Sequence, residues 1–195
     1  MCGRFYIEID EKELQDIVSA VEKNTRAQPE QMTFEATGRE NSIEIFPTNV
    51  VPVQTGSGSY QQMKWGFTGF DKKPIINARS ETALEKPMFR DSMRERRCLI
   101  PASGYYEWKK DGSIKTKYQF YLPNGPMYFA GCWRQEKSSG LLTFVILTRQ
   151  AVNGAVEIHD RMPVIIPKDH AEAWLHDGPD AMSAAVTMLQ IQLAS

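Results

Sequence analysis

Apolar side chains recur at helical spacing near the start of the chain. Within residues 11–24 they fall on one face and charged residues occupy the others; the apolar positions are Leu14, Ile17, Val18 and Val21. This pattern predicts an amphipathic helix that buries one stripe against the body of the protein. Residues 25–41, which follow, are polar and have no period, so we expect them to be irregular.

Short runs rich in β-branched and aromatic residues predict strands after this region. In the first half these runs are Ser42–Phe46, Asn49–Gln54 and Gln61–Gly66. The sequence GSGS at 56–59 separates two of them and is typical of a hairpin turn. Residues 82–94 have helical character, and we expect an interruption at Pro87 because proline has no backbone N–H.

The second half contains most of the strand-forming sequence. The predicted strands are Arg97–Pro101, Gly104–Lys109, Tyr118–Leu122, Met127–Trp133, Leu141–Thr148 and Met162–Ile166. The dipeptides Asp-Gly at 111–112 and Asn-Gly at 124–125 lie between such runs and predict hairpin turns. Asp169–Leu175 predicts a short helix after Pro167, with Asp169 as its N-cap.

Many short strands, few helices and no alternating strand–helix rhythm predict an α+β fold. We expect one β-rich domain over residues 1–195, with an antiparallel, barrel-like sheet and a few flanking helices. The chain has 195 residues, of which 42% are hydrophobic, and this is enough for one sizeable core.

Charge and cysteine content exclude several classes of protein. The formal net charge is −1, so any nucleic-acid face must be a local cluster of Arg and Lys. The three cysteines form no CxxC pair, which argues against a disulfide scaffold and a thiolate zinc site. There is no apolar run of membrane-spanning length and no secretory signal at the start of the chain. We therefore expect a cytoplasmic monomer that uses neither a membrane, a metal nor a cofactor.

Cys2 follows the initiator methionine. Its small side chain permits removal of Met1 during synthesis, which would leave a free amine and a thiol on neighbouring carbons. Such an amine has a pKa of about 7.7–8.0, so an unprotonated fraction can attack an aldehyde to give a Schiff base. The thiol can then add to the imine carbon and close a five-membered thiazolidine ring. The alternative is that a cysteine near the terminus has no chemical role.

Two polar segments offer further groups for a site. In IINARSET, residues 75–82, Asn77 supplies a donor and an acceptor and Arg79 can hold a phosphate, although the segment is also typical of a strand end. In GYYEW, residues 104–108, strand alternation puts Glu107 on one face with Tyr105. An inward-pointing Glu107 would be suited to proton transfer, whereas an outward-pointing one would be an ordinary exposed carboxylate.

His159 is the third candidate, in IHDRMPV at 158–164. A histidine at the start of a strand can act as an acid or base near neutral pH, or it can be a structural residue bonded to Asp160. His170 and His176 are expected at the surface. No set of histidines and carboxylates has the spacing of a metal site.

Taken together, these segments resemble the SRAP (SOS-response-associated peptidase) family, which includes the bacterial abasic-site shield proteins. The resemblance rests on MCGRF at 1–5, WGF at 65–67, INARSET at 76–82, CLIPASG at 98–104, GYYEW at 104–108, FVILT at 144–148 and IHDRMP at 158–163. These motifs occur in the same order over nearly the whole chain. The resemblance implies a β-rich α+β domain with a basic groove leading to Cys2.

The resemblance also implies a role for each matching residue. Cys2 would crosslink to the aldehyde of an abasic site in single-stranded DNA, with Asn77 orienting it, Glu107 moving protons and His159 helping to open the sugar ring. The implied DNA contacts are Arg4, Asn49, Arg79 and Arg161. Phe70 is the only aromatic residue in the short loop after WGF where family members place a base-unstacking wedge.

Two other functions are compatible with the same residues. One is a cysteine-type autopeptidase or N-terminal-nucleophile hydrolase, in which the Cys2 thiol first removes the leader residue. The other is a noncatalytic reader that holds a flipped, modified base in the same pocket. The first alternative predicts that Met1 persists in a Glu107→Gln variant made without methionine aminopeptidase. The second predicts unaltered binding when Cys2 becomes serine.

Overall fold

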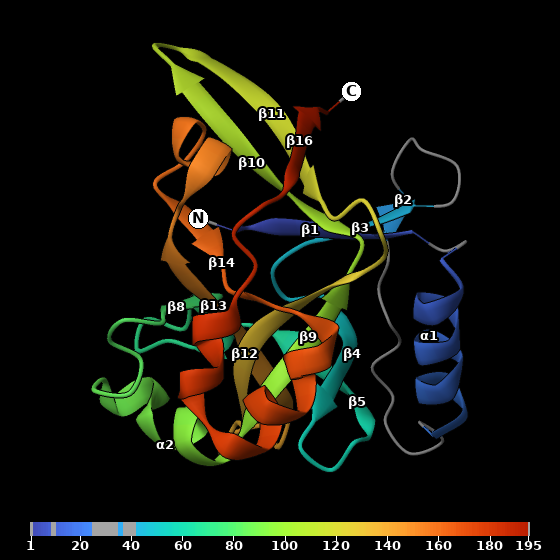
Figure 1. Ribbon diagram of the computed structural model, residues 1–195. Helices are drawn as coiled ribbons and strands as arrows, with labels where there is room; N and C mark the ends of the chain where they lie inside the picture. Colours follow the sequence, from blue (N-terminus) through green and yellow to red (C-terminus); the bar gives the residue numbers. More distant parts are fainter. Residues whose placement is uncertain (1, 9–10, 25–34, 37–41, 195) are drawn as a thin grey trace.

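The computed structural model describes residues 2–8, 11–24, 35–36 and 42–194. Its first sheet is antiparallel and has the strand order β16-β11-β10-β1-β3-β2 (Figure 1). These strands are Gln190–Leu193 (β16), Ile114–Tyr121 (β11), Gly104–Asp111 (β10), Arg4–Glu8 (β1), Ser42–Ile45 (β3) and Glu35–Ala36 (β2). The N-terminal strand β1 is therefore a central strand, which places the start of the chain within the protein body.

The second sheet contains a closed five-stranded barrel. The barrel order is β13-β5-β4-β9-β12, and β12 pairs back to β13. These strands are Leu142–Gln150 (β13), Tyr60–Trp65 (β5), Val50–Thr55 (β4), Arg97–Ala102 (β9) and Met127–Gln135 (β12). Three short strands pair at its margins: Asn77–Arg79 (β8), Arg161–Pro163 (β14) and Ile165–Ile166 (β15). A separate ribbon joins β6 (Phe67–Thr68) and β7 (Pro74–Ile75).

In the described part of the chain, α-helices and tight helical turns flank the sheets (Figure 1). The α-helices are α1 (Lys12–Asn24) and α2 (Pro87–Glu95). Three 3₁₀ turns span Asn153–Glu157 (η1), Lys168–His170 (η2) and Pro179–Ala184 (η4), and a π-helical turn spans Ala173–Asp177 (η3). Among the described residues, no helix is both long and apolar enough to cross a membrane.

An aromatic core joins the two sheets. Phe5 of β1 packs against Trp65 of β5 and Phe129 of β12, with ring centroids 5.2 and 5.7 Å apart. Tyr105 of β10 contacts the edge of Phe129 at 6.2 Å. All four rings are fully buried, so the odd-numbered residues of β1 and β10 face the barrel.

The predicted α+β class and barrel-like sheet are confirmed, as is the helix at 11–24, in which Leu14 and Ile17 are buried. The side chains of Val18 and Val21 and most of the segment 25–41 lie outside the described residues. The part of that segment that is described contains strand β2, so its prediction as wholly irregular was wrong. The barrel is also not purely antiparallel, because β13 runs parallel to β5 and β8.

The turn at 56–59 and the Asp-Gly turn at 111–112 are confirmed hairpins. The Asn-Gly prediction at 124–125 was wrong, because it joins β11 of one sheet to β12 of the other. Pro87 begins α2 instead of interrupting a helix, since the first helical position needs no backbone N–H. The predicted strand Met162–Ile166 is divided into β14 and β15.

The helix predicted for Asp169–Leu175 is confirmed as one run of helical turns, in which η2 continues through Ala171 and Glu172 into η3. Pro167 occupies the N-cap position of η2 and makes no side-chain capping bond. The Asp169 side chain contacts the neighbouring His170 ring at 3.0 Å and does not cap the turn. The N-cap prediction for Asp169 was therefore wrong. His170 and His176 are exposed, as expected.

Candidate functional site

Asn77 and Cys2, which are 75 positions apart in the sequence, meet in the structure. The Asn77 Nδ2 donates a hydrogen bond of 2.7 Å to the carbonyl oxygen of Cys2. The position of Asn77 is fixed from its other side, because the Trp65 indole N–H donates to the carbonyl of Ile76 at 2.9 Å. The motifs MCGRF, WGF and INARSET are thereby linked in one local structure around Cys2.

Cys2 is fully buried, and its thiol lies close to the carboxylate of Glu107. Burial raises the pKa of the Cys2 thiol well above its ordinary value, and the negative charge of Glu107 raises it further. The thiol is therefore protonated at neutral pH. Glu107 is 4% exposed, which settles the choice left open by the sequence: it points inward.

Tyr105 shares this inward face and was missed by the sequence analysis as a site residue. Burial raises the pKa of its hydroxyl, and electrostatic interactions with Cys2 and Glu107 raise it further. Its ring stacks on Phe120 with centroids 4.6 Å apart. Because side chains alternate along GYYEW, the sequence predicts Tyr105 and Glu107 on one face. This pattern was sufficient to predict Tyr105 as a residue of the candidate site.

Two buried polar atoms near Cys2 lack hydrogen-bond partners among the described residues. They are Asn77 Oδ1 and the Tyr105 hydroxyl. A buried polar atom without a partner is costly in free energy, and native proteins rarely leave one unexplained. Two such atoms beside a buried thiol and a buried carboxylate are groups that a bound ligand would satisfy.

His159 lies in the bend between η1 and β14. Its Nδ1 accepts a hydrogen bond of 3.0 Å from the Arg161 backbone N–H and lies 2.8 Å from Asp160 Oδ1. The ring is about 29% exposed, so it can be reached from solvent. The structural contact with Asp160 that the sequence suggested is present, and a role for His159 in sugar-ring opening remains a prediction.

Arg4 extends from the outer face of β1, opposite to the face that carries Phe5. Its guanidinium lies between the rings of Phe46 and Trp108, 4.6 and 5.0 Å from their centroids. It also forms an ion pair of 3.3 Å with Glu44, a buried carboxylate. Arg4 is thus held in place while its side chain remains 41% exposed.

Asn49 stabilises the turn that carries Phe46. Its Oδ1 accepts a hydrogen bond of 2.7 Å from the Phe46 backbone N–H, and its carbonyl accepts one of 2.9 Å from Trp65. Thr48, inside this turn, has a positive φ of 76°, which a β-branched residue adopts only when its neighbours impose it. These contacts make Asn49 a positioning residue, and direct DNA contact by Asn49 stays a prediction.

Arg79 and Arg161 lie on strands that flank the same residue of β13. Thr148 pairs with Arg79 of β8 on one side and with Pro163 of β14 on the other. Arg79 is exposed. Arg161, in contrast, forms a bidentate ion pair with Glu81, at 2.7 and 2.8 Å, and a phosphate would have to compete with that carboxylate.

Phe70 occupies the tip of the turn between β6 and β7. Phe70 is 99% exposed, the highest value among the large hydrophobic residues that the structure describes. The turn is closed by a hydrogen bond of 3.0 Å from the Gly69 N–H to the Lys73 carbonyl. The ring is therefore exposed on a closed turn, and its role as a base-unstacking wedge stays a prediction.

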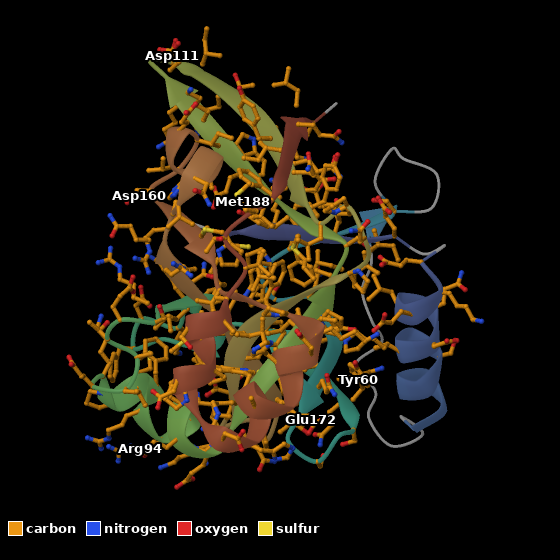
Figure 2. All side chains as sticks on the ribbon, viewed as in Figure 1. Tyr60, Arg94, Asp111, Asp160, Glu172 and Met188 are labelled. Carbon is orange, nitrogen blue, oxygen red and sulfur yellow. The ribbon has the colours of Figure 1, made fainter. Side chains whose placement is uncertain are left out.

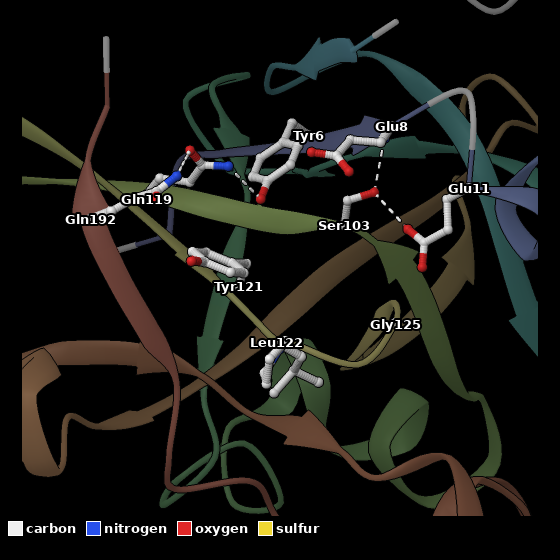
Figure 3. A pocket seen from close by; sticks show the side chains of 10 residues that line it. Tyr6, Glu8, Glu11, Ser103, Gln119, Tyr121, Leu122, Gly125 and Gln192 are labelled. Carbon is white, nitrogen blue, oxygen red and sulfur yellow. Dashed lines mark hydrogen bonds between the residues drawn. The ribbon is translucent and has the colours of Figure 1, made fainter.

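A cavity of about 450 Å³ lies on the outer side of the sheet that contains β1 (Figure 3). It is lined by Tyr6, Glu8, Glu11, Ser103, Gln119, Tyr121, Leu122, Pro123, Gly125 and Gln192. Ser103 donates to Glu11 at 3.0 Å, and Gln119 donates to the Tyr6 hydroxyl at 2.6 Å. Because two carboxylates and no cations line it, this cavity repels a phosphodiester and is not the candidate DNA site.

No group of three or more His, Cys, Asp or Glu side chains that could hold a metal occurs in the part of the chain that the structure describes.

The candidate site has two parts. The first is the buried cluster of Cys2, Asn77, Tyr105 and Glu107. The second consists of the side chains Arg4, Arg79 and Phe70, which reach the surface from separate strands and turns, and of Arg161, whose side chain is 13% exposed.

Comparison with known proteins gives one family and a consistent set of relatives. A family profile described as SOS response associated peptidase (SRAP) matches residues 1–194. The "Abasic site processing protein YedK" of Escherichia coli is 31% identical over 184 residues, which cover 90% of this chain and 79% of YedK. The "Abasic site processing protein YoaM" of Bacillus subtilis is 34% identical over 149 residues, covering 69% of this chain and 66% of YoaM, just under two thirds of that relative.

Solved structures show the same fold. A protein from Bacteroides thetaiotaomicron superposes with a TM-score of 0.75 and 21% identity, covering 98% of this chain and 92% of that one. A phage-related protein from Bordetella bronchiseptica gives a TM-score of 0.72 and 23% identity, covering 99% of this chain and 94% of that one.

Proposed function

This chain belongs to the SOS response associated peptidase (SRAP) family, and from that premise we propose that it is an abasic-site processing protein. It binds single-stranded DNA and captures the ring-opened deoxyribose of an abasic site as a thiazolidine on Cys2. The adduct shields the lesion during the response to DNA damage. The observation that carries this proposal is the contact of Asn77 with Cys2 beside the buried Glu107 carboxylate.

The chemistry requires that Met1 be removed, so that Cys2 has a free amine. The amine nitrogen attacks the sugar aldehyde, and loss of one water gives a Schiff base. The thiol sulfur then bonds to the same carbon, and the thiol proton passes through Glu107 to the nitrogen. The balance is one aldehyde and one aminothiol giving one thiazolidine and one water, without oxidation or reduction.

The surrounding residues have separate tasks in this scheme. Asn77 holds the Cys2 carbonyl and so fixes the direction of the amine and thiol. His159, reachable from solvent, assists the opening of the sugar ring to its aldehyde. Arg4 and Arg79 bind phosphates, Arg161 does so after exchanging Glu81 for phosphate, and Phe70 stacks on a base next to the lesion.

The protonation state of Cys2 favours this scheme over peptidase chemistry. A cysteine peptidase begins with a thiolate nucleophile, whereas burial and Glu107 keep the Cys2 thiol protonated. In aldehyde capture the amine reacts first, and the thiol is deprotonated only when the Schiff base is already in place. Lyase-like Schiff-base chemistry is therefore our proposal for the reaction class.

A denaturing gel tests the proposal. Mature protein, with the loss of Met1 verified by intact mass, is incubated with single-stranded DNA that carries one abasic site. We expect a slowly migrating adduct with the wild type and none with Cys2→Ala. The double variant Cys98→Ala/Cys132→Ala, which removes the other two buried cysteines, is the matched control and retains the adduct. An absent wild-type adduct, or one that survives Cys2→Ala, overturns the proposal.

A further inference from the structure

The hairpin formed by β10 and β11 extends beyond the rest of its sheet (Figure 1). Strand β1 pairs with β10 only up to Tyr106, and β16 pairs with β11 only from Tyr118 onward. The segment from Trp108 to Lys117 is therefore a two-stranded ribbon with no further strand beside it among the described residues. In Figure 2, Asp111 at its tip is the uppermost labelled residue.

This ribbon is strongly basic, although the whole chain has a net charge of −1. It contains Lys109, Lys110, Lys115 and Lys117 and only one acid, Asp111. The register pairs Trp108 with Lys117 and Lys110 with Lys115 directly across the two strands. Because side chains alternate along a strand, these four residues share one face, and Asp111 lies on the other.

The same face includes Arg4. The Arg4 guanidinium lies 5.0 Å from the centroid of the Trp108 ring, and the Lys117 ammonium lies 5.9 Å from it. Arg4 and Lys117 also share a single carboxylate, that of Glu44, at 3.3 and 3.4 Å. Two cations on one carboxylate leave an excess of positive charge. We call the surface made by Arg4, Trp108, Lys110, Lys115 and Lys117 the outer hairpin face.

Lys110 and Lys115 are the informative pair on this face. Like charges directly opposite each other on two strands destabilise a sheet. Neither lysine has an acidic partner among the described residues, so the repulsion between them is not offset within that part of the protein. This repulsion is relieved when external anions, such as successive phosphates, bind the two ammonium groups.

The charge on the outer side of this sheet changes sign along β1. Arg4, Tyr6 and Glu8 alternate with the buried residues and face the same way, so the basic hairpin lies at one end and the Glu8–Glu11 cavity at the other. A polyanion is attracted to the first and repelled by the second. The hairpin also adjoins the site along the chain, because Glu107, which interacts with Cys2, directly precedes Trp108, although their side chains point to opposite faces of β10.

We propose that the outer hairpin face binds the phosphodiester backbone of the DNA strand that flanks the abasic nucleotide. Lys110, Lys115 and Lys117 contact successive phosphates, and Trp108 offers the exposed part of its ring to a base. The hairpin holds the flanking strand on the outer side of the sheet, at the end of β1 where Arg4 lies two residues after Cys2, without reading its sequence. This inference rests on the proposed function, because it is the lesion chemistry that selects DNA as the polyanion.

Noncovalent binding tests the proposal independently of the crosslink. All variants carry Cys2→Ala, and a fluorescently labelled single strand without an abasic site is titrated by anisotropy over a range of KCl concentrations. For Lys110→Ala/Lys115→Ala, we expect the slope of log affinity against log salt to fall by about 0.7 for each lysine. At about 0.1 M salt this corresponds to a loss of affinity of about fivefold per lysine, or about 25-fold for the pair.

The matched control is Lys12→Ala/Arg94→Ala, which removes two exposed cations on helices α1 and α2. Arg94 lies at the opposite end of the molecule from Asp111 (Figure 2). An unchanged affinity and slope for the hairpin variant, or an equal loss for the control, overturns the inference. Since no covalent step takes part, a negative result here leaves the abasic-site gel unaffected, and an absent adduct on the gel leaves this titration readable.

Discussion

Asn77 donates its side-chain N–H to the backbone carbonyl of Cys2 at 2.7 Å. The bond connects a strand at the margin of the barrel to the first residues of a central strand of the other sheet. Cys2 precedes the first residue of β1, so the ladder of that sheet does not fix its direction. The Asn77 side chain supplies this constraint at the Cys2 carbonyl, and under the proposed function it thereby directs the amine and thiol of Cys2.

Replacing Asn77 by alanine should slow crosslinking without preventing it. Loss of one hydrogen bond of about 1–1.5 kcal/mol corresponds to about a tenfold decrease in the fraction of correctly oriented Cys2. The measurement is the initial rate of adduct formation on a denaturing gel. Asn124→Ala, in an exposed turn, is the control and should leave the rate unchanged. Equal rates for Asn77→Ala and wild type would exclude an orienting role.

Removing the Tyr105 hydroxyl should stabilise the fold. The hydroxyl is buried and has no partner among the described residues, and such a group costs about 1–3 kcal/mol. Tyr105→Phe keeps the ring that stacks on Phe120, so the free energy of unfolding should rise by about 1 kcal/mol. Urea denaturation measures it. Tyr128→Phe, which removes a hydroxyl that donates to Glu13, should lower stability instead, and the reverse order would contradict the assignment.

The sequence could predict much of this site because its motifs are local. Alternation within GYYEW placed Tyr105 with Glu107, and hairpin dipeptides identified the turn at 111–112. What alternation cannot give is which of the two faces is buried, since that depends on the sheet packed against it. The inward direction of Glu107 follows from the barrel residues Phe129 and Trp65, which are distant in sequence.

Contacts between segments that are distant in the sequence could not be predicted either, because they depend on tertiary packing. The sequence suggested Arg161 as a phosphate ligand, but Glu81, 80 positions away, occupies its guanidinium. The Asn-Gly turn at 124–125 has the composition of a hairpin and instead joins two sheets. Whether two strands pair is decided by the tertiary arrangement, and turn residues alone do not specify it.

The pair of Glu81 and Arg161 should contribute to stability in a defined range of pH. Hydrogen bonding to Arg161 lowers the pKa of Glu81 from 4.5 to about 2. A lowered folded-state pKa adds stability above the unfolded value, near 4.5, and this is lost as the pH falls toward about 2. The Tm difference between wild type and Glu81→Gln should therefore shrink over this range. Because Glu81 is 47% exposed, the difference should be small, and one that grew on acidification would contradict the pairing.

The same substitution should strengthen DNA binding. When residue 81 is neutral, no carboxylate competes with a phosphate for the Arg161 guanidinium. One further phosphate contact increases the affinity about fivefold at about 0.1 M salt. Anisotropy of an unmodified single strand, in the Cys2→Ala background, measures this. Glu85→Gln removes an equal charge from an exposed position four residues away and controls for long-range repulsion. If both variants gain equally, Arg161 makes no phosphate contact.

Lys110→Glu should stabilise the protein while it weakens DNA binding. The substitution converts the repulsive pair Lys110–Lys115 into an attractive one, and cross-strand pairs of opposite charge contribute about 0.2–1 kcal/mol. Thermal melting measures the stability and salt-dependent anisotropy the binding. Lys109→Glu is the matched control, because its cross-strand neighbour is Thr116 and no lysine pair is relieved. We expect Lys110→Glu to raise the melting temperature and lower the affinity for DNA, and Lys109→Glu to leave the melting temperature unchanged. This combination would mean that the lysine pair serves anion binding and reduces the stability of the fold. A gain without any loss of affinity would assign the pair no role in DNA binding.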